Sequence, residues 1–333
     1  MRSQTILRHA STLLLSLAAL AASPIAGDDL AGLKGDIRID GSSTVYPITE
    51  AVTEDFSKLA KGVHATVGVS GTGGGFKRFC KGETDISDAS RPITKAEADT
   101  CRSSGIEFVE LPVAYDALTI VVNPANDWMK SVSVDQLKRI FGASNTAKTW
   151  KDLDSSWPDR PIKCYSPGTD SGTFDYFREV TVGKDGKIRS DMSVSEDDNV
   201  LVNGVEGDRD AIGFFGFAYY TENKGKLRAV PVDGGKGAVT PSDATILDGS
   251  YSPFSRPLFI YVNRKSADRA EVQAFVDFYL RQATELAKSV GYTPLPAPVQ
   301  ATAAANWKSR RTGTQFLDAA GNKVAGALPS VYK

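Results

Sequence analysis

Hydroxyl-bearing residues and glycines cluster at three places in this 333-residue sequence: Ser42-Ser43-Thr44, Thr72-Gly73-Gly74-Gly75 and Asp170-Ser171-Gly172-Thr173. Each cluster follows a strand-like run and precedes a helical pattern. A helix start has N–H groups without intrahelical partners and carries partial positive charge, so it attracts anions. Hydroxyls add O–H donors, and glycine lets the backbone approach a ligand. One such cluster is typical of a helix cap or a loop, but three predict an oxyanion site.

Catalytic residues are scarce. The sequence has two histidines, His9 and His64, and neither a G-x-S-x-G elbow nor a nucleotide P-loop. A hydrolase with Ser171 or Ser43 as nucleophile would lack a histidine base in its motifs. We therefore expect a binding protein, not an enzyme, with neither a cofactor nor a metal site.

The first 26 residues form a segment of their own. Arg2 and Arg8 precede an apolar run that is too short for a comfortable membrane span, and small residues follow, as in a secretory signal peptide. We expect export from the cytoplasm. Removing the two arginines takes the net charge from −1 to about −3. A mildly acidic mature chain argues against nucleic-acid binding.

Three cysteines follow this segment. Cys80 and Cys101 could close a loop of about 20 residues, and a disulfide is plausible in an exported protein. Cys164 would be left over as a small buried residue in a strand.

The order of elements indicates an α/β fold. Strand-like runs at 36–41, 64–70 and 84–90 alternate with a helix at about 47–60 and another starting near Phe76. Downstream, Ala211–Tyr220 is expected to be a strand, and an amphipathic helix ends at Gly291. The tail from Pro294 has little pattern and is expected to wrap the surface.

Two similar apolar strands, Ala117–Asn123 and Arg256–Asn263, are interpreted as crossings between two lobes. One lobe then comprises residues 27–118 and 256–333, and the other comprises residues 119–255.

The motifs "DGSSTVYP", "SGTGGGFKRF", "DISDASRPI" and "SPGTDSGTF", in this order, resemble those of the periplasmic phosphate-binding proteins of phosphate ABC transporters. The resemblance extends more weakly over nearly the whole chain after residue 26. It implies two lobes, each with a mostly parallel sheet flanked by helices, joined by two hinge strands. It also implies a monomer that binds inorganic phosphate and delivers it to a membrane permease.

The resemblance also implies a set of phosphate-binding residues. The three clusters and the segment after "DIS" supply Ser43, Thr44, Val45, Thr72, Gly73, Ser90, Arg91, Asp170, Ser171, Gly172 and Thr173.

Two positions depart from the best-known members of that family. Arg91 stands where they have an aspartate, and Ser166-Pro167-Gly168 stands where they have an arginine. We infer that Arg91 supplies the positive charge, although a surface ion pair is its alternative. A buried acid that accepts the phosphate proton would exclude sulfate. Asp170 either has this role or caps the following helix; Asp88 and Asp116 are weaker candidates.

Two alternative hypotheses retain this fold but change the ligand or the function. Sulfate, molybdate or tungstate would fit a cage of neutral donors without a buried acid. An adhesive surface protein would retain the fold and bind no anion.

Overall fold

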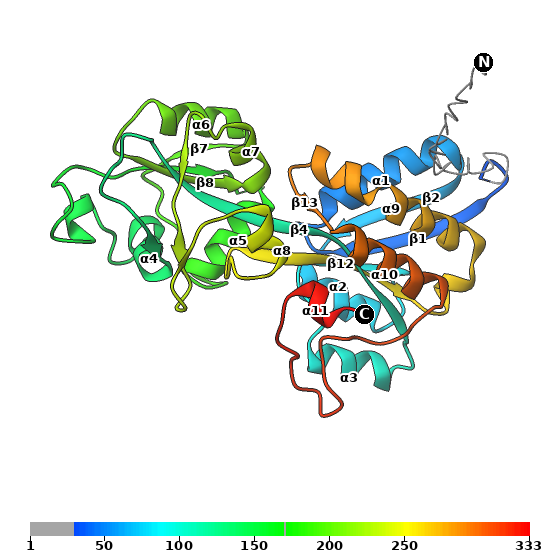
Figure 1. The fold of residues 1–333 in the computed structure, drawn as a ribbon. Helices are drawn as coiled ribbons and strands as arrows, with labels where there is room; N and C mark the ends of the chain where they lie inside the picture. Colours follow the sequence, from blue (N-terminus) through cyan, green and yellow to red (C-terminus); the bar gives the residue numbers. More distant parts are fainter. Residues whose placement is uncertain (1–29, 170) are drawn as a thin grey trace, which may run out of the picture.

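The computed structural model describes residues 30–169 and 171–333, so the predicted signal peptide and Asp170 lie outside the described residues. The described chain forms two lobes (Figure 1). Strands β4 (Phe108–Val122) and β12 (Ser255–Asn263) run side by side between them as antiparallel neighbours. Within the described ranges, no helix combines the length and the apolar character that a bilayer crossing requires.

Lobe 1 is built on the parallel strands β1, β2 and β3. Strand β1 lies between the other two, so all three end at one edge of the sheet. Helices α1 and α9 cover one face and α2 covers the other (Figure 1). The elements of this lobe are β1 (Lys34–Gly41), α1 (Tyr46–Leu59), β2 (Gly62–Val69), α2 (Gly71–Phe79), β3 (Ile86–Ala89), α3 (Lys95–Ser103), the 3-10 turn η2 (Ser266–Asp268), α9 (Ala270–Ser289), β13 (Thr293–Pro294), α10 (Ala297–Lys308) and α11 (Leu328–Val331).

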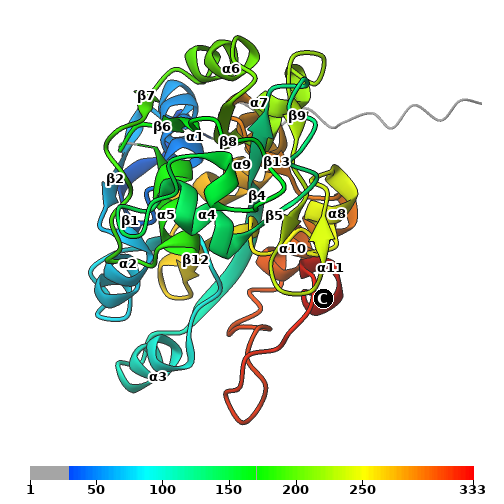
Figure 2. The same cartoon turned by 90° about the vertical axis from the view of Figure 1, so that its left-hand side faces the viewer.

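Lobe 2 is built on β8, which pairs with β4 on one side and with the parallel strand β6 on the other. Figure 2 views this lobe from its end, with α4 and α5 toward the viewer. Its elements are β5 (Val132–Ser133), α4 (Val134–Phe141), the 3-10 turn η1 (Trp150–Asp152), β6 (Lys163–Pro167), α5 (Gly172–Thr181), β7 (Ser193–Ser195), α6 (Asp198–Glu206), β8 (Ala211–Gly216), α7 (Phe217–Glu222), β9 (Arg228–Ala229), β10 (Val232–Asp233), β11 (Ala238–Val239) and α8 (Asp243–Leu247).

Strand β4 belongs to both sheets. Its residues 108–117 pair with β12 in lobe 1, and its residues 118–122 pair with β8 in lobe 2. Every residue of β4 is buried. The sequence predicted only its second half, because Glu110, Pro112 and Asp116 interrupt the apolar pattern before Ala117. The structure buries these two acids against polar partners, so the strand continues through them.

The expected start of α2 was wrong. This helix begins at Gly71, so Thr72–Gly75 form its first turn instead of a loop before it. Close packing explains the glycines. A Cβ atom on Gly75 would lie 2.6 Å from the Cα of Gly41 and 2.9 Å from the hydroxyl of Ser87. Gly75 therefore lets α2 approach the sheet at the end of β1, where a larger residue would force it away.

Two other expectations need correction. The run Ala211–Tyr220 is a strand only to Gly216, after which α7 begins. The tail contains α10, an alanine-rich helix whose Val299, Ala303 and Trp307 are buried. Alanine favours helix without requiring a strong apolar stripe, which is why periodicity missed this element.

The predicted disulfide is confirmed. Cys80, at the end of α2, bonds to Cys101 in α3, with 4.2 Å between their Cα atoms. Cys164 is a buried free thiol in β6, also as expected. The bridge attaches α3, which projects from the body of lobe 1, to the helix beside the sheet (Figure 1).

Replacing both bridged cysteines with alanine should destabilise the protein. The chain-entropy model gives a loss of about 3 kcal/mol for a loop of this length. Urea unfolding of the double variant and of the oxidised wild type measures the difference. With dithiothreitol present, the bridge in the wild type is reduced, so the two proteins should differ little in their free energy of unfolding. A double variant as stable as the oxidised protein would contradict the structural role.

Candidate functional site

The first hydroxyl cluster lies where β1 meets α1. The N–H of Ser42 donates to the carbonyl of Asp88 at 3.0 Å, which ties this turn to the end of β3. The N–H of Thr44 donates to the Ser42 hydroxyl at 3.2 Å. Ser42 and Thr44 are buried, and Ser43 between them is half-buried. The turn is therefore fixed at the edge of the sheet where the parallel strands end.

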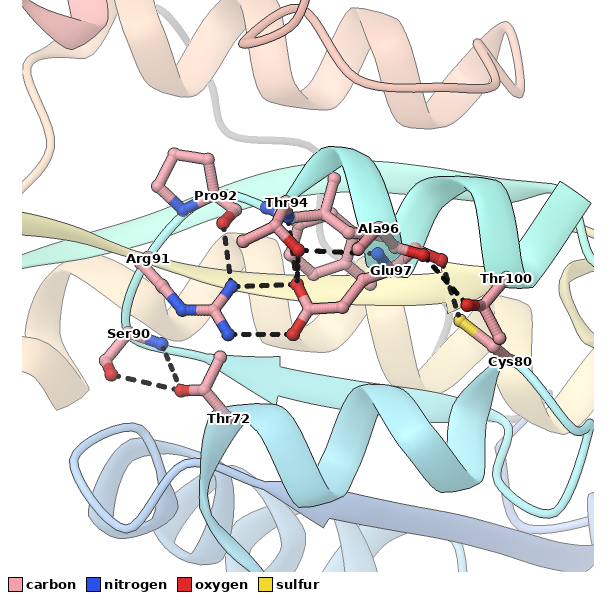
Figure 3. A network of polar contacts seen from close by, with 11 residues as sticks. Thr72, Cys80, Ser90, Arg91, Pro92, Thr94, Ala96, Glu97 and Thr100 are labelled. Carbon is pink, nitrogen blue, oxygen red and sulfur yellow. Dashed lines mark hydrogen bonds and ion pairs between the residues drawn. The ribbon is translucent and has the colours of Figure 1, made fainter. Parts of the chain in front are cut away.

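The second cluster meets the segment after β3. The Thr72 hydroxyl accepts a hydrogen bond from the N–H of Ser90 at 3.1 Å and lies 3.1 Å from the Ser90 hydroxyl (Figure 3). Two of the predicted residues are thus in direct contact. Next to them, Gly73 is exposed in the first turn of α2, and a Cβ atom there would meet no described atom within 4 Å.

The third cluster comes from lobe 2 and reaches the first. Ser171 caps α5, and its hydroxyl accepts from the N–H of Thr173 at 3.2 Å. A Cβ atom on Gly172 would lie 3.1 Å from both the Cα and the hydroxyl oxygen of Thr44. Only glycine permits this approach without displacing a neighbour. The start of α5 therefore lies within contact distance of the Ser42–Thr44 turn of lobe 1.

Arg256 joins the two lobes at this point, and the sequence prediction missed it. It lies near the start of β12, opposite Asp116 on β4. Its Nε donates to Asp116 Oδ2 at 3.1 Å, and its Nη2 donates to Thr44 Oγ1 at 3.0 Å. Its guanidinium carbon lies 3.7 Å from the centre of the Tyr176 ring on α5. The hinge strands, lobe 1 and lobe 2 therefore meet at one side chain, which is 15% exposed.

The sequence held only part of the signal for Arg256. Charged residues stand at the start of both predicted crossing strands, Asp116 just before Ala117 and Arg256 at the first position of its strand. The antiparallel register that brings them together depends on the first half of β4, which the sequence pattern did not predict.

Arg91, the predicted source of positive charge, is engaged elsewhere. Its Nη1 and Nη2 donate to the two carboxylate oxygens of Glu97 at 2.9 and 2.8 Å, and Nη1 also donates to the Pro92 carbonyl (Figure 3). Glu97 in turn caps α3 through Thr94. Contact between Arg91 and an anion stays a prediction, and it would require this guanidinium to leave a bidentate partner.

The hydrogen-bond directions leave donors for a ligand. Because Thr44 accepts from Arg256, its own hydroxyl hydrogen remains available to another acceptor. The same holds for Ser171, which accepts from a backbone N–H. Tyr292 also holds the Ser42–Thr44 turn in place, since its hydroxyl donates to the Thr44 carbonyl at 2.8 Å. This arrangement can hold an oxyanion with hydroxyl and amide donors beside one guanidinium.

The candidate acids occupy different environments. Asp116 is 1% exposed; one carboxylate oxygen accepts from Arg256, while Oδ1 is buried without a partner among the described residues. Burial raises the pKa of Asp116, and Arg256 opposes that rise. Asp88 is also buried, and neither of its carboxylate oxygens has a partner in the described ranges. Burial raises the pKa of Asp88 to about 8, so it is mostly protonated at neutral pH.

A cavity of about 660 Å³ lies elsewhere, between α3 and residues 312–321, and none of the described residues that line it belongs to the three clusters. Helix α3 and the segment 312–321 both project from the lower side of lobe 1 (Figures 1 and 2). The first and third clusters instead meet at a contact between the lobes, at Thr44 and Gly172, whereas the contacts of Thr72 and Ser90 lie within lobe 1.

These features define a two-lobed α/β fold in which the helix start of α5 and the Ser42–Thr44 turn meet beside Arg256. Consistent with this, residues 26–283 match the family model described as a PBP superfamily domain. The chain is 49% identical to protein SphX of Synechococcus elongatus over 98% of its own length and 96% of the relative's. It is 42% identical to the phosphate-binding protein PstS of Staphylococcus haemolyticus, over 79% and 82% of the two chains. The chain belongs to the PBP superfamily, in the family of the SphX and PstS proteins.

Two solved structures with names that refer to phosphate have a fold similar to that of this chain. A "possible phosphate binding protein" from Planctomyces limnophilus is 44% identical, with a TM-score of 0.82 over 84% of this chain and 99% of that one. A putative phosphate ABC transporter substrate-binding protein from Clostridium perfringens, solved with bound phosphate, is 25% identical. Its TM-score is 0.51 over 79% of this chain and 100% of that one.

Asp88→Asn should make stability less dependent on pH. The pKa of this acid rises from 3.8 when exposed to about 8 in the fold. Between these values the folded protein binds a proton that the unfolded chain does not, so the free energy of unfolding falls as pH rises. Asparagine should remove that contribution, which is at most about 1.4 kcal/mol per pH unit.

Urea unfolding at pH 5 and pH 8 measures the slope for wild type and variant. Asp185→Asn, an exposed acid in lobe 2, is the control and should keep the wild-type slope. If the free energy of unfolding depended on pH equally in wild type and in Asp88→Asn, Asp88 would not be protonated in the folded protein.

Proposed function

We propose that this chain captures inorganic phosphate outside the inner membrane and delivers it to the permease of an ABC transporter. The observation that carries the proposal is the contact of Gly172 with Thr44 beside the Arg256–Thr44 hydrogen bond. Donors from both lobes and a charge on the hinge converge there. The names of the PstS relative and of the C. perfringens structure support phosphate as the ligand.

The proposed site encloses phosphate between the helix starts of the two lobes. Hydroxyls and backbone N–H groups would donate to its oxygens, and Arg256 would supply charge-assisted hydrogen bonds. Lobe closure about β4 and β12 would then exclude water. The donors proposed are Ser43, Thr44, Val45, Thr72, Gly73, Ser90, Ser171, Gly172 and Thr173, with Arg91 as a second guanidinium if it leaves Glu97.

The chain is proposed to act as a monomeric binding protein without catalytic activity. The one histidine of the described residues, His64, is exposed and pairs with Asp36 near the start of the parallel strands. The clusters lie at the opposite ends of those strands, so no histidine base stands beside Ser43 or Ser171. We also propose that the lobes divide near residues 118 and 255 and that the mature chain is periplasmic.

Asp116 is the acid best placed to select phosphate over sulfate. Its Oδ2 orients Arg256, and its buried Oδ1 can accept a hydrogen bond. Hydrogen phosphate at neutral pH offers an O–H, whereas sulfate does not. An anion oxygen without a proton would face this carboxylate with no compensating hydrogen bond. The role remains open to Asp170, which lies outside the described residues, whereas Asp88 is enclosed in lobe 1.

Isothermal titration calorimetry with phosphate and sulfate tests the proposed function. We expect phosphate to bind at least about 100-fold more tightly, because the unmet acceptor costs sulfate about 3 kcal/mol. Asp116→Asn should reduce that ratio, whereas Asp88→Asn should preserve it. Equal affinities in wild type would contradict the selectivity. Binding of molybdate or tungstate instead would identify a different oxyanion as the ligand.

Arg256→Gln should weaken phosphate binding more than Arg91→Gln. Loss of two charge-assisted hydrogen bonds predicts a decrease of at least about 100-fold for Arg256, while Arg91 is already occupied by Glu97. Arg256→Lys keeps the charge but loses the fork, so it should fall in between. Thermal unfolding of each variant checks that it folds. A larger effect of Arg91→Gln would place the ligand charge at Arg91.

A further inference from the structure

Helix α5 presents one face to the hinge arginine. Gly172, Tyr176 and Glu179 are spaced by four and three residues, so they lie on one side of the helix. Gly172 faces Thr44, and the Tyr176 ring stacks on the Arg256 guanidinium. Glu179 completes this face, with its Oε2 3.9 Å from Nη1 of Arg256.

The Glu179 carboxylate lies near the guanidinium of Arg256 on the hinge strand β12 and acts at longer range on Arg91. Besides Arg256, it acts on Arg91 of lobe 1: Glu97 contributes most to raising the pKa of Arg91, and the more distant charge of Glu179 adds to it. The Glu179 side chain is 61% exposed and makes an ion pair with Arg256 at 3.9 Å without a hydrogen bond. It is therefore a negative charge on lobe 2 held near the positive charge of the hinge.

The Glu179 carboxylate has two possible electrostatic effects, and they act over different distances. It attracts Arg256 across 3.9 Å, and it would repel an anion held at the start of α5. Seven residues separate Gly172 from Glu179, which is roughly 10 Å along a helix. At about 0.1 M salt the Debye length is also about 10 Å, so the repulsion is largely screened while the nearer attraction is not. The attraction between lobe 2 and the hinge should prevail.

We propose that Glu179 is a latch that ties α5 of lobe 2 to Arg256 of the hinge and slows the opening of the closed lobes. Because this opening would release the bound anion, the inference rests on the proposed function for its kinetic consequence. Glu179 does not contact the anion; it acts through Arg256 and sets the residence time of phosphate rather than its recognition.

The test compares phosphate release from wild type, Glu179→Gln and Asp185→Asn by stopped-flow displacement. Asp185 is an exposed acid in the turn after α5, with no ion-pair partner among the described residues, so it controls for the change in net charge. Glu179→Gln should release phosphate two- to fivefold faster, as expected for an exposed ion pair. The difference should shrink in 1 M salt, and Asp185→Asn should match wild type.

A second readout requires no ligand and separates this inference from the proposed function. Small-angle X-ray scattering of the phosphate-free proteins should give Glu179→Gln a larger radius of gyration than wild type and Asp185→Asn. If no variant bound phosphate, the function would fail while this comparison still tested the latch. Unchanged or slower release, or an unchanged radius, would overturn the proposal; slower release with tighter binding would identify Glu179 as a source of repulsion.

Discussion

The hydrogen-bonded group of Arg256, Asp116 and Thr44 is the interaction on which the rest of the site depends. A guanidinium this little exposed needs an acidic partner, and Asp116 supplies it from the neighbouring hinge strand. The antiparallel register of β4 and β12 places the two residues opposite each other. Since Arg256 also holds Thr44 and stacks on Tyr176, one charge connects the hinge with both lobes.

Around this charge, the remaining polar groups are oriented as donors. Thr44 is held by Ser42 at its N–H, by Tyr292 at its carbonyl and by Arg256 at its hydroxyl oxygen. A hydroxyl whose oxygen accepts a hydrogen bond in this way can still donate its hydrogen to another acceptor. Such a cage can bind an anion closely while adding little fixed charge, which leaves discrimination between anions to the acid beside the arginine.

Local sequence patterns predicted the parts of the site that one segment forms alone. The hydroxyl clusters, the capped helix starts and the pairing of Cys80 with Cys101 depend on neighbouring residues or short loops. Arg256 was missed because its importance arises from pairing with Asp116, 140 positions away. Likewise, the glycines of α2 predicted a loop, since nothing local reveals that Gly75 packs on Gly41. Arg91 was assigned by its position between motifs, and its pairing with Glu97 depends on the fold of α3.

A crystal structure of the protein grown with phosphate tests the central claim most directly. We predict one tetrahedral anion between the lobes, within hydrogen-bond distance of the Thr44 hydroxyl, the Arg256 guanidinium and the start of α5. An anion held in lobe 1 alone, or one whose only guanidinium contact is Arg91 while Arg256 remains on Asp116 and Thr44, would contradict it.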